Sequence, residues 1–240
     1  MKLIEAKWIE GTLKRRYKRF LADIILENGQ EITAHCPNTG AMRGLLEEGR
    51  PVWLSDDQSP RRRYRYTWQA IKVDDTWVGM NTHLPNKLMK VALSKKLLEP
   101  FKGYEHVKSE VVVAPQVRFD FLLSNDKDKC YLEVKNVHYQ EKGVALFPDS
   151  RTTRGLKHLE FLCQKVKEGI RAAVVYVVQR EGCHLFDFGE AFDPCYAKGA
   201  QKALDQGVEM YAYTFSLKEN GVFLGPLIPR RSEVVRSEAV

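Results

Sequence analysis

Two carboxylates and a lysine stand close together near the middle of the sequence, in segments rich in strand-forming residues. Asp120 lies inside Val117–Leu123, although aspartate is depleted in strands. Glu133 and Lys135 follow in Tyr131–Val137. Side chains alternate along a strand, so Glu133 and Lys135 share one face. If the two strands are neighbours, the two acids and the lysine converge.

This set of groups suits the hydrolysis of a phosphodiester. Two carboxylates form a hard-oxygen site of the kind that Mg²⁺ or Mn²⁺ prefers. A lysine beside them can orient water or stabilise the charge that builds on a phosphate. The structural alternative is an ordinary ion pair, because charged residues make up 29% of the chain and Glu-x-Lys triplets are common.

The segments around these residues predict a mixed α/β sheet. Periodic apolar positions predict one helix that Pro100 ends and a long amphipathic helix from Leu156 to Ile170. The valine-rich run Ala172–Gln179 is typical of a buried, parallel strand. The predicted order is α-β-β-β-α-β-α-β, over Leu84–Glu99, Val107–Ala114, Val117–Leu123, Tyr131–Val137, the long helix, Ala172–Gln179, Pro194–Gln206 and Val208–Leu217.

The first third of the chain has a different pattern, with short strands and few helical periods. Asn28-Gly29 is a strong hairpin signal between two of these strands. Five or six short strands in some eighty residues favour a small all-β Greek-key barrel of the OB type. We therefore expect two domains, residues 1–83 and 84–228, followed by a frayed tail at 229–240. The barrel strands are expected at Ile4–Leu13, Phe20–Glu27, Glu31–Cys36, Pro51–Ser55, Thr67–Val73 and Trp77–Thr82.

Basic residues interleaved with aromatic ones form two runs within the expected barrel. The chain carries 38 Lys and Arg against 31 Asp and Glu, a net charge of +7. Cations beside aromatic rings suit a surface that neutralises phosphates and stacks on bases, whereas a solvated strand face is the structural alternative. The candidate nucleic-acid contacts are Lys14, Arg15, Arg16, Lys18, Arg19, Arg61, Arg62, Arg63 and Arg65.

Composition also limits the compartment. No apolar run reaches the length of a membrane span, and the N-terminus lacks a secretory signal. Five cysteines are scattered and odd in number, which fits neither a disulfide framework nor a zinc knuckle. These features favour a reduced, cytoplasmic protein without membrane contact.

Together, the acids and the order of elements resemble the PD-(D/E)xK nuclease superfamily. In its core the first acid lies on the second strand and the E-x-K triplet on the third. The resemblance implies that Asp120 and Glu133 bind Mg²⁺ or Mn²⁺ and that Lys135 is the catalytic lysine. It also implies a further acidic ligand at Glu110, for which a solvent-facing strand residue is the alternative.

Five further blocks make the likeness more specific. The chain is similar to the sugar fermentation stimulation protein A family over nearly its whole length, on Tyr17–Asp23, His35–Met42, Glu133–Val137, Phe147–Asp149 and Arg154–Leu159. This resemblance implies an OB-like domain, a nuclease-like domain, DNA binding with little sequence preference and a regulatory role in sugar (maltose) metabolism. A homodimer is compatible with it.

Three functions stay open from the sequence. The first is a DNA-binding protein with a divalent-metal phosphodiesterase (nuclease) site. The second is a catalytically silent DNA-binding regulator, although no helix-turn-helix is recognisable. The third is a sugar- or metabolite-binding module that uses the barrel mouth.

Several residues are secondary candidates for a site. His35 ends a strand and Asn38 lies in the turn that follows, and this block either is structural or contacts a phosphate. Asp149 is either a helix-start acid or part of the site. Arg154 and His158 share a helix face, where the arginine could grip a phosphate and the histidine is either a base or a satisfied buried residue.

Overall fold

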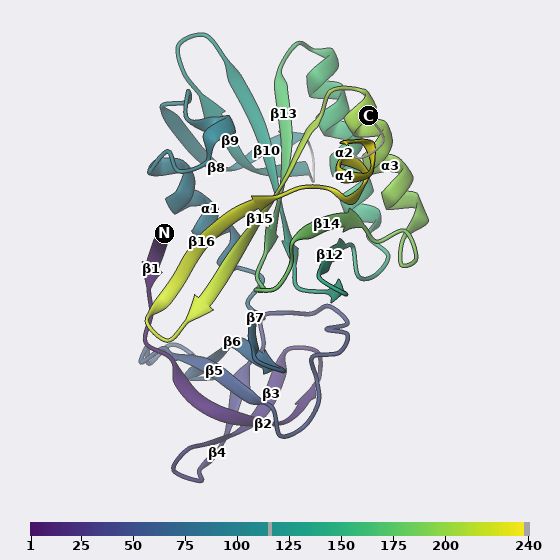
Figure 1. Ribbon diagram of the computed structural model, residues 1–240. Helices are drawn as coiled ribbons and strands as arrows, with labels where there is room; N and C mark the ends of the chain where they lie inside the picture. The colour runs from purple at the N-terminus through teal and green to yellow at the C-terminus, as the bar shows by residue number, and fades with distance from the viewer. Residues whose placement is uncertain (115–116, 238–240) are drawn as a thin grey trace.

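The computed structural model describes residues 1–114 and 117–237, in which a small barrel lies beneath a larger α/β domain (Figure 1). The barrel strands follow the order β4-β3-β2-β5-β6, and a parallel β4–β6 pairing, His35 to Thr67, closes the sheet. β7 adds to β6 at the edge. The predicted OB-type barrel is confirmed. Its strands are β2 Ile9–Tyr17, β3 Leu21–Leu26, β4 Glu31–His35, β5 Pro51–Asp56, β6 Tyr66–Val73 and β7 Thr76–Gly79.

The barrel closes around alternate side chains of its strands. Asn28-Gly29 forms the expected turn, in which Gly29 has φ +81° and β3 pairs with β4 in antiparallel register. Such a φ suits glycine, which has no Cβ to clash. The barrel core is apolar and fully buried, with Leu13, Ile24 and Trp68 among its members. This burial gives the small domain a core of its own.

The larger domain is a seven-stranded mixed sheet in the order β1-β16-β15-β13-β10-β9-β8. β13 is parallel to both β10 and β15, and its valines are buried on both faces, as the sequence predicted. The strands are β1 Lys2–Glu5, β8 His106–Ala114, β9 Val117–Ser124, β10 Lys129–Val137, β13 Arg171–Val178, β15 Glu209–Lys218 and β16 Gly221–Ile228.

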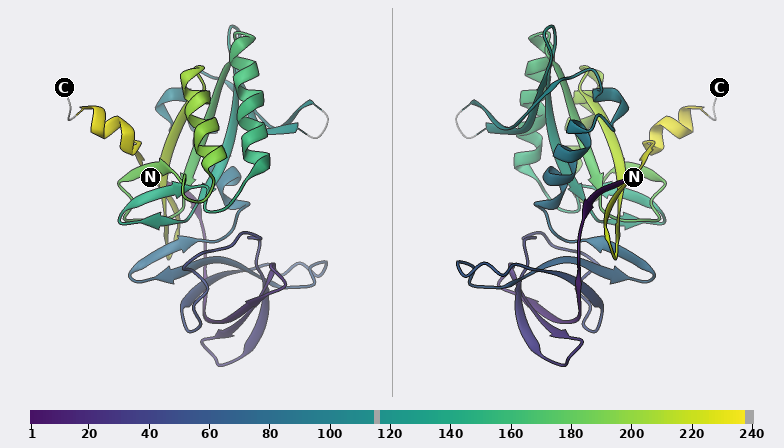
Figure 2. Two further views of the ribbon diagram at one scale, coloured as in Figure 1. Left: turned by 90° about the vertical axis from the view of Figure 1, so that its right-hand side faces the viewer. Right: turned by 90° about the vertical axis from the view of Figure 1, so that its left-hand side faces the viewer.

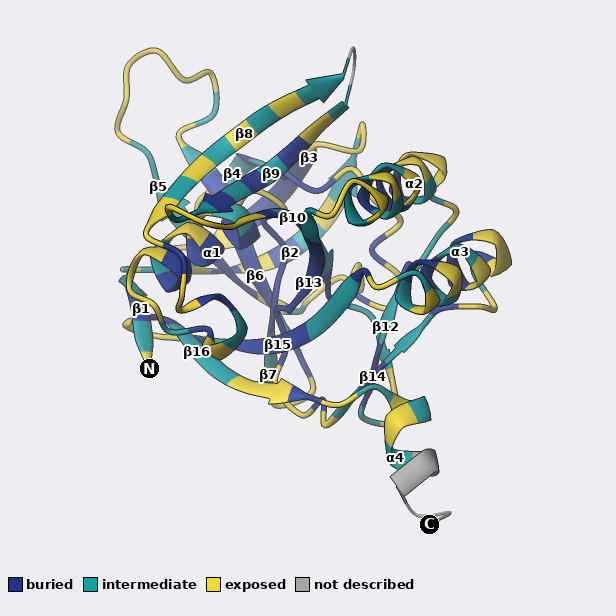
Figure 3. Ribbon diagram, turned by 90° about the horizontal axis from the view of Figure 1, so that it is seen from above, coloured by how far each residue is buried: buried dark blue, intermediate teal, exposed yellow. Residues whose placement is uncertain are grey.

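Helices cover both faces of this sheet (Figure 3). α1 (Leu84–Ser94) packs on one face, and α2 (Thr153–Lys167) and α3 (Pro194–Asp205) lie side by side on the other. Each helix buries a stripe of apolar side chains against the strands. No helix within residues 1–114 and 117–237 is long and apolar enough to cross a membrane.

The first expected strand, Ile4–Leu13, is two strands in two domains. β1 pairs with β16 of the large sheet, and β2 enters the barrel (Figure 2). Between them Trp8 stacks on Trp53 with 5.9 Å between ring centroids and donates its indole N–H to the Lys218 carbonyl. The expected barrel segment 1–83 therefore contributes its first strand to the larger domain, because this anchor fixes the chain where it changes sheets.

Other expected boundaries also change. The helix expected over Leu84–Glu99 ends at Ser94, because Lys96 takes φ +52° and the Leu97 amide bonds back to the Ala92 carbonyl, with a 3₁₀ turn following at Glu99–Phe101. The sequence missed β16, which contains strand-depleted Gly and Pro, and a small sheet of β11 Gln140–Glu141, β12 Val144–Phe147 and β14 Leu185–Phe188.

The tail at 229–240 is not frayed where the structure describes it. α4 spans Arg231–Ser237, and the Glu233 carboxylate in its first turn accepts from the Arg230 amide at 3.0 Å. An acid in the first turn stabilises a helix through its dipole. Residues 238–240 lie outside the described residues.

A close backbone approach joins the two domains. The Gly79 amide of β7 donates to the Gln179 carbonyl at 2.8 Å, directly after β13. A Cβ on Gly79 would lie 2.6 to 2.8 Å from the Gln179 side chain, so only glycine fits there. Trp53 stacks on Trp77 nearby, with centroids 3.6 Å apart. These contacts set the barrel against the start of α1 and the C-terminal ends of β10 and β13.

Candidate functional site

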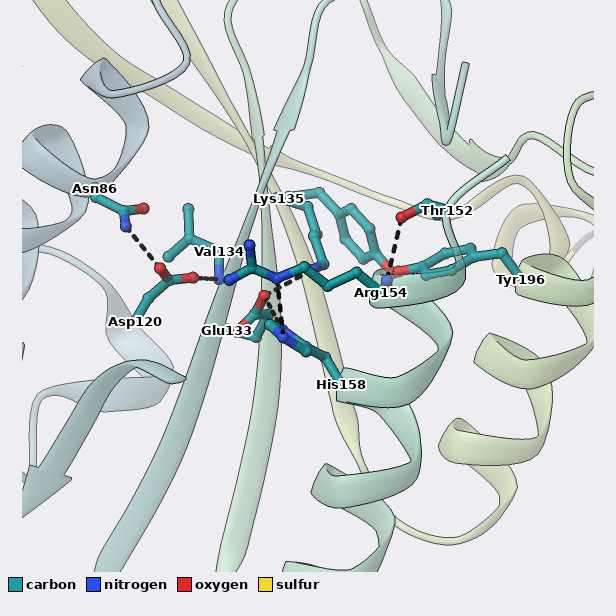
Figure 4. A network of polar contacts seen from close by, with 11 residues as sticks. Asn86, Asp120, Glu133, Val134, Lys135, Thr152, Arg154, His158 and Tyr196 are labelled. Atoms are coloured by element: carbon teal, nitrogen blue, oxygen red, sulfur yellow. Dashed lines mark hydrogen bonds and ion pairs between the residues drawn. The ribbon is translucent and has the colours of Figure 1, made fainter. Parts of the chain in front are cut away.

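The two acids lie where the pairing between β9 and β10 ends. The antiparallel register runs to Leu132 and Phe121, and one further step places Glu133 opposite Asp120. There the backbone ladder is replaced by a side-chain bond, because the Val134 amide donates to Asp120 Oδ2 at 2.7 Å (Figure 4). The Asp120 carboxylate thus points from β9 toward the strand that carries Glu133.

Asp120 has a second fixed partner from the opposite direction. The Asn86 side chain of α1 donates its Nδ2 to Asp120 Oδ1 at 2.6 Å. Each carboxylate oxygen therefore accepts one protein hydrogen bond and keeps a further lone pair. The strand and the helix together fix the orientation of this acid.

Glu133 is buried, with 4% of its surface exposed, and its two oxygens differ. Oε1 accepts from Lys135 Nζ at 2.6 Å and lies 2.5 Å from His158 Nδ1 of α2. Oε2 is buried and makes no hydrogen bond to any described residue. A buried carboxylate oxygen without a partner is costly, so Oε2 has the capacity to bind a cation.

Burial and mutual repulsion define the electrostatics of the pair. Burial, together with the negative charge of Glu133, raises the pKa of Asp120 from 3.8 to about 6. Burial alone would raise the pKa of Glu133 too, but Lys135 and His158 outweigh it and lower that pKa below its ordinary value. The site thus holds one firmly ionised carboxylate beside one that a proton or a cation can neutralise.

The two acids fit a divalent cation as a two-carboxylate site. Asp120 and Glu133 would offer hard oxygen ligands, and Glu133 Oε2, which has no hydrogen-bond partner among the described residues, has a free lone pair. The structure does not bring Glu110 to them: it is exposed on β8, with φ +56°, and pairs with Arg118 at 3.1 Å. Across the described ranges no group of three or more His, Cys, Asp or Glu side chains is arranged to hold a metal.

The start of α2 supports Glu133 from the other side. His158, buried at 5% exposure, contacts Glu133 through Nδ1, and its Nε2 lies 3.4 Å from Arg154 Nε. Thr152 caps the helix by accepting from the Gly155 amide at 3.1 Å. The expected shared face of Arg154 and His158 is confirmed, with the histidine against the acid.

Asp149 is not the residue that caps α2. Its Oδ2 lies 3.3 Å from His138 Nε2, just beyond β10, and that imidazole lowers the pKa of Asp149. His138 in turn lies 3.4 Å from the Asn136 side chain, which accepts from Gln179. Sequence reasoning missed Asn86, Asn136 and His138. Asn86 and Asn136 contact residues 34 and 43 positions away. His138 pairs with Asp149 on the far side of β11 and β12, which no periodicity describes.

The His35–Met42 block is a braced turn at the barrel edge. Asn38 accepts from the Gly40 amide at 2.9 Å, and Arg16 donates to the Asn38 and Gly40 carbonyls. Arg19 donates to the Thr39 carbonyl. Asn38 is therefore structural through its Oδ1 and its carbonyl, whereas His35, at the end of β4, faces a cleft.

The structure divides the predicted basic contacts into paired and unpaired cations. Arg16 and Arg19 hold backbone carbonyls, as described, and carboxylates pair with four others: Glu31 with Lys14, Asp23 with Arg15, Asp57 with Arg62 and Asp56 with Arg65. Within the described ranges Lys18, Arg61 and Arg63 are exposed and make no ion pair; Arg63 lies over the Tyr64 ring.

Comparison with known proteins gives two family matches and many relatives. Residues 15–80 match the SfsA N-terminal OB domain, and residues 83–221 match the sugar fermentation stimulation protein RE domain. A sugar fermentation stimulation protein homolog of Pseudoalteromonas atlantica is 44% identical over 92% of this chain and 96% of its own. One of a Synechococcus strain is 46% identical over 88% of each chain.

A solved structure shares the fold. The structure of Pyrococcus furiosus SfsA in complex with Ca²⁺ superposes with a TM-score of 0.88, covering 96% of this chain and 99% of that one at 24% identity. The likeness confirms the barrel and the restriction-endonuclease-like α/β domain as one arrangement.

Proposed function

The chain belongs to the sugar fermentation stimulation protein family, and from its site on β9 and β10 we propose that it is a nucleic-acid-binding phosphodiesterase that depends on a divalent cation. The observation that carries this proposal is the asymmetry of Glu133. One oxygen is held by Lys135 and His158, and the other is buried without a partner beside a second carboxylate. A bound cation would give the second oxygen a partner, whereas an ordinary ion pair with Lys135 needs only the first.

Asp120 and Glu133 would hold the cation, which supplies charge neutralisation and a more acidic water at the phosphate. Asn86 and the Val134 amide fix Asp120, and His158 fixes Glu133. Lys135, with a side chain 12% exposed, lies beside Glu133 and would donate to the attacking water or to the phosphate oxygens. The relative from Pyrococcus furiosus was solved with Ca²⁺, an oxygen-seeking cation, which supports a divalent site in this chain.

The wild-type protein tests this directly. We expect Mn²⁺ or Mg²⁺ to bind with one site by calorimetry, and single- or double-stranded DNA to be cleaved only when the cation is present. Cation binding without cleavage of any nucleic acid would support the metal site but contradict the nuclease activity. If no cation binds, both the metal site and the nuclease activity are contradicted.

We also expect DNA binding that falls steeply with salt, because the barrel meets phosphates through cations. Replacing the unpaired Lys18, Arg61 and Arg63 by Gln should reduce the slope of log affinity against log salt by about 2 to 3, whatever the sequence. A matched control replaces three exposed lysines on α2 and α3: Lys167, Lys198 and Lys202. If both triple variants weaken binding equally, the barrel run is not the contact surface.

A catalytically silent DNA-binding regulator is the second candidate. One observation favours it: only two carboxylates, and no larger group in the described ranges, converge at the site. Such a protein would bind DNA through the same cations and show no cleavage with any divalent cation. The wild-type assay above separates the two functions.

A further inference from the structure

A polar cleft lies between the barrel and the start of α1, apart from the paired acids. Its volume is about 720 Å³, which is large enough for a nucleotide unit. One wall comes from the barrel, with His35 and Arg62, and the other from the lead into α1, with Asn81, His83 and Lys87. The acids on β9 and β10 do not account for this cluster, and of its members only His35 and Arg62 were candidates from the sequence.

We propose that this cleft binds a backbone phosphate of a nucleic-acid strand, next to the phosphate that lies at Asp120 and Glu133. This inference rests on the proposed function for its ligand class, but it concerns binding and not cleavage. The ligand chemistry is a phosphate group, held by imidazole and ammonium donors at the positive end of a helix dipole.

Charge is the first argument. The two acids that line the cleft are already neutralised, since Asp57 pairs with Arg62 at 2.7 Å and Asp56 pairs with Arg65. Lys87 is exposed and makes no ion pair within the described residues. Burial is the main cause that lowers the pKa of His35, and the nearby Arg62 and His83 lower it further. The effect of Arg62 and His83 shows that basic side chains cluster around His35 on this side of the cleft.

The helix that borders the cleft contributes its dipole. α1 begins after His83, whose side chain makes no cap bond, and its first turn contains no acidic residue. The His83 and Leu84 amides already donate to Asn81, and Pro85 has no N–H, so this end of the helix acts on a ligand through its dipole, which favours a negative group there. His83 and Lys87 flank this end, so two side chains can donate from one side of the cleft.

The floor of the cleft is rigid. Asn81 donates to the Gln69 side chain at 2.9 Å and accepts from the His83 amide at 2.9 Å. Gln69 donates in turn to Ser55 at 2.8 Å. This chain of amides fixes the backbone of His83 before any ligand binds, which reduces the entropy cost of binding.

Position links the cleft to the acids. Lys87 lines the cleft, and its neighbour Asn86 holds Asp120 at 2.6 Å. Consecutive Cα atoms are about 3.8 Å apart, so one turn of α1 touches both sites. A strand with one phosphate at the acids would therefore place an adjacent phosphate at His83 and Lys87.

Fluorescence anisotropy with a labelled single-stranded DNA, in EDTA, measures binding without cleavage. We expect Lys87→Gln and His83→Ala each to weaken binding by about tenfold, the usual size for a hydrogen bond to a charged group. Lys90→Gln removes the same charge one turn further along α1, away from the cleft, and should change affinity less than twofold.

A second arm identifies the phosphate. Single neutral methylphosphonate linkages, placed one at a time, should weaken wild-type binding at one linkage in particular, and that loss should disappear in Lys87→Gln. A 5′-phosphate compared with a 5′-hydroxyl shows whether a terminal phosphate occupies the cleft instead of an internal one.

Equal affinities for Lys87→Gln and Lys90→Gln, with no linkage that couples to Lys87, would overturn the proposal. If the protein still cleaves DNA in that case, only the proposed phosphate site in the cleft is contradicted. Conversely, coupling at Lys87 in a protein that never cleaves DNA would support the phosphate site and contradict the nuclease activity. A wild type that binds no nucleic acid would overturn both.

Discussion

Replacing Glu133 by Gln should lower Mn²⁺ affinity at least about a hundredfold, and any cleavage should fall with it. The substitution keeps the shape of the side chain. Its carbonyl oxygen can still accept from Lys135 and His158, which both contact Oε1 in the wild type. Its amide nitrogen then occupies the position of the unpartnered Oε2, so a donor faces the cation where a ligand lone pair stood.

Lys135→Met, on the same strand, distinguishes cation binding from the cleavage step. The lysine is not a cation ligand, so calorimetry should show Mn²⁺ affinity near the wild-type value. The cleavage rate should fall by about 10² to 10³, the usual cost of losing a donor aimed at developing charge. Lys129→Met, at the exposed start of β10, is the matched control and should leave both quantities unchanged.

Two results would contradict this assignment. Equal Mn²⁺ affinity in the wild type and in a folded Glu133→Gln variant would show that the acids do not bind the cation. The second is a Lys135→Met variant that binds Mn²⁺ more weakly than the wild type but cleaves at the same rate once saturated with it. That result would show that the lysine maintains the metal site and takes no part in the cleavage step.

The sequence predicted the relation of Glu133 to Lys135 correctly because that relation is local. Alternation along one strand places both on one face whatever surrounds them, and the structure gives 2.6 Å between their charged atoms. The placement of Asp120 on the neighbouring strand followed from the order of elements. Its partners Asn86 and the Val134 amide did not, because no periodicity encodes contacts across 34 and 14 positions.

Pairing between strands explains why the basic runs hold fewer unpaired cations than the sequence alone indicates. Arg15 meets Asp23 because β2 pairs with β3 directly opposite, and Arg65 meets Asp56 because β5 pairs with β6. A run of cations looks unopposed in sequence when its acids lie on the next strand. The division of Ile4–Leu13 was hidden for the same reason, since β1 finds its partner in β16, more than 200 residues away.

Replacing Asp120 by Asn should stabilise the metal-free protein at neutral pH while it destroys the cation site. A folded-state pKa of about 6, against an ordinary value of 3.8, means that the folded protein binds this proton more tightly than the unfolded chain does. The stability that this group contributes is therefore fully present below about pH 4 and is lost as the pH rises to about 6. Asn carries no charge to desolvate and can still accept from the Val134 amide.

Chemical denaturation in EDTA should thus give a variant about 2 kcal/mol more stable than the wild type at pH 7, a difference that shrinks toward zero near pH 4. Asp126→Asn, which removes an exposed acid after β9, is the control and should stay within about 0.5 kcal/mol of the wild type. Saturating Mn²⁺ should reverse the order, because only the wild type gains stability by binding it. If Asp120→Asn were less stable than the wild type at pH 7 in EDTA, the bonds from Asn86 and Val134 would outweigh the repulsion from Glu133. The site would then be built for a structural carboxylate and not for a cation.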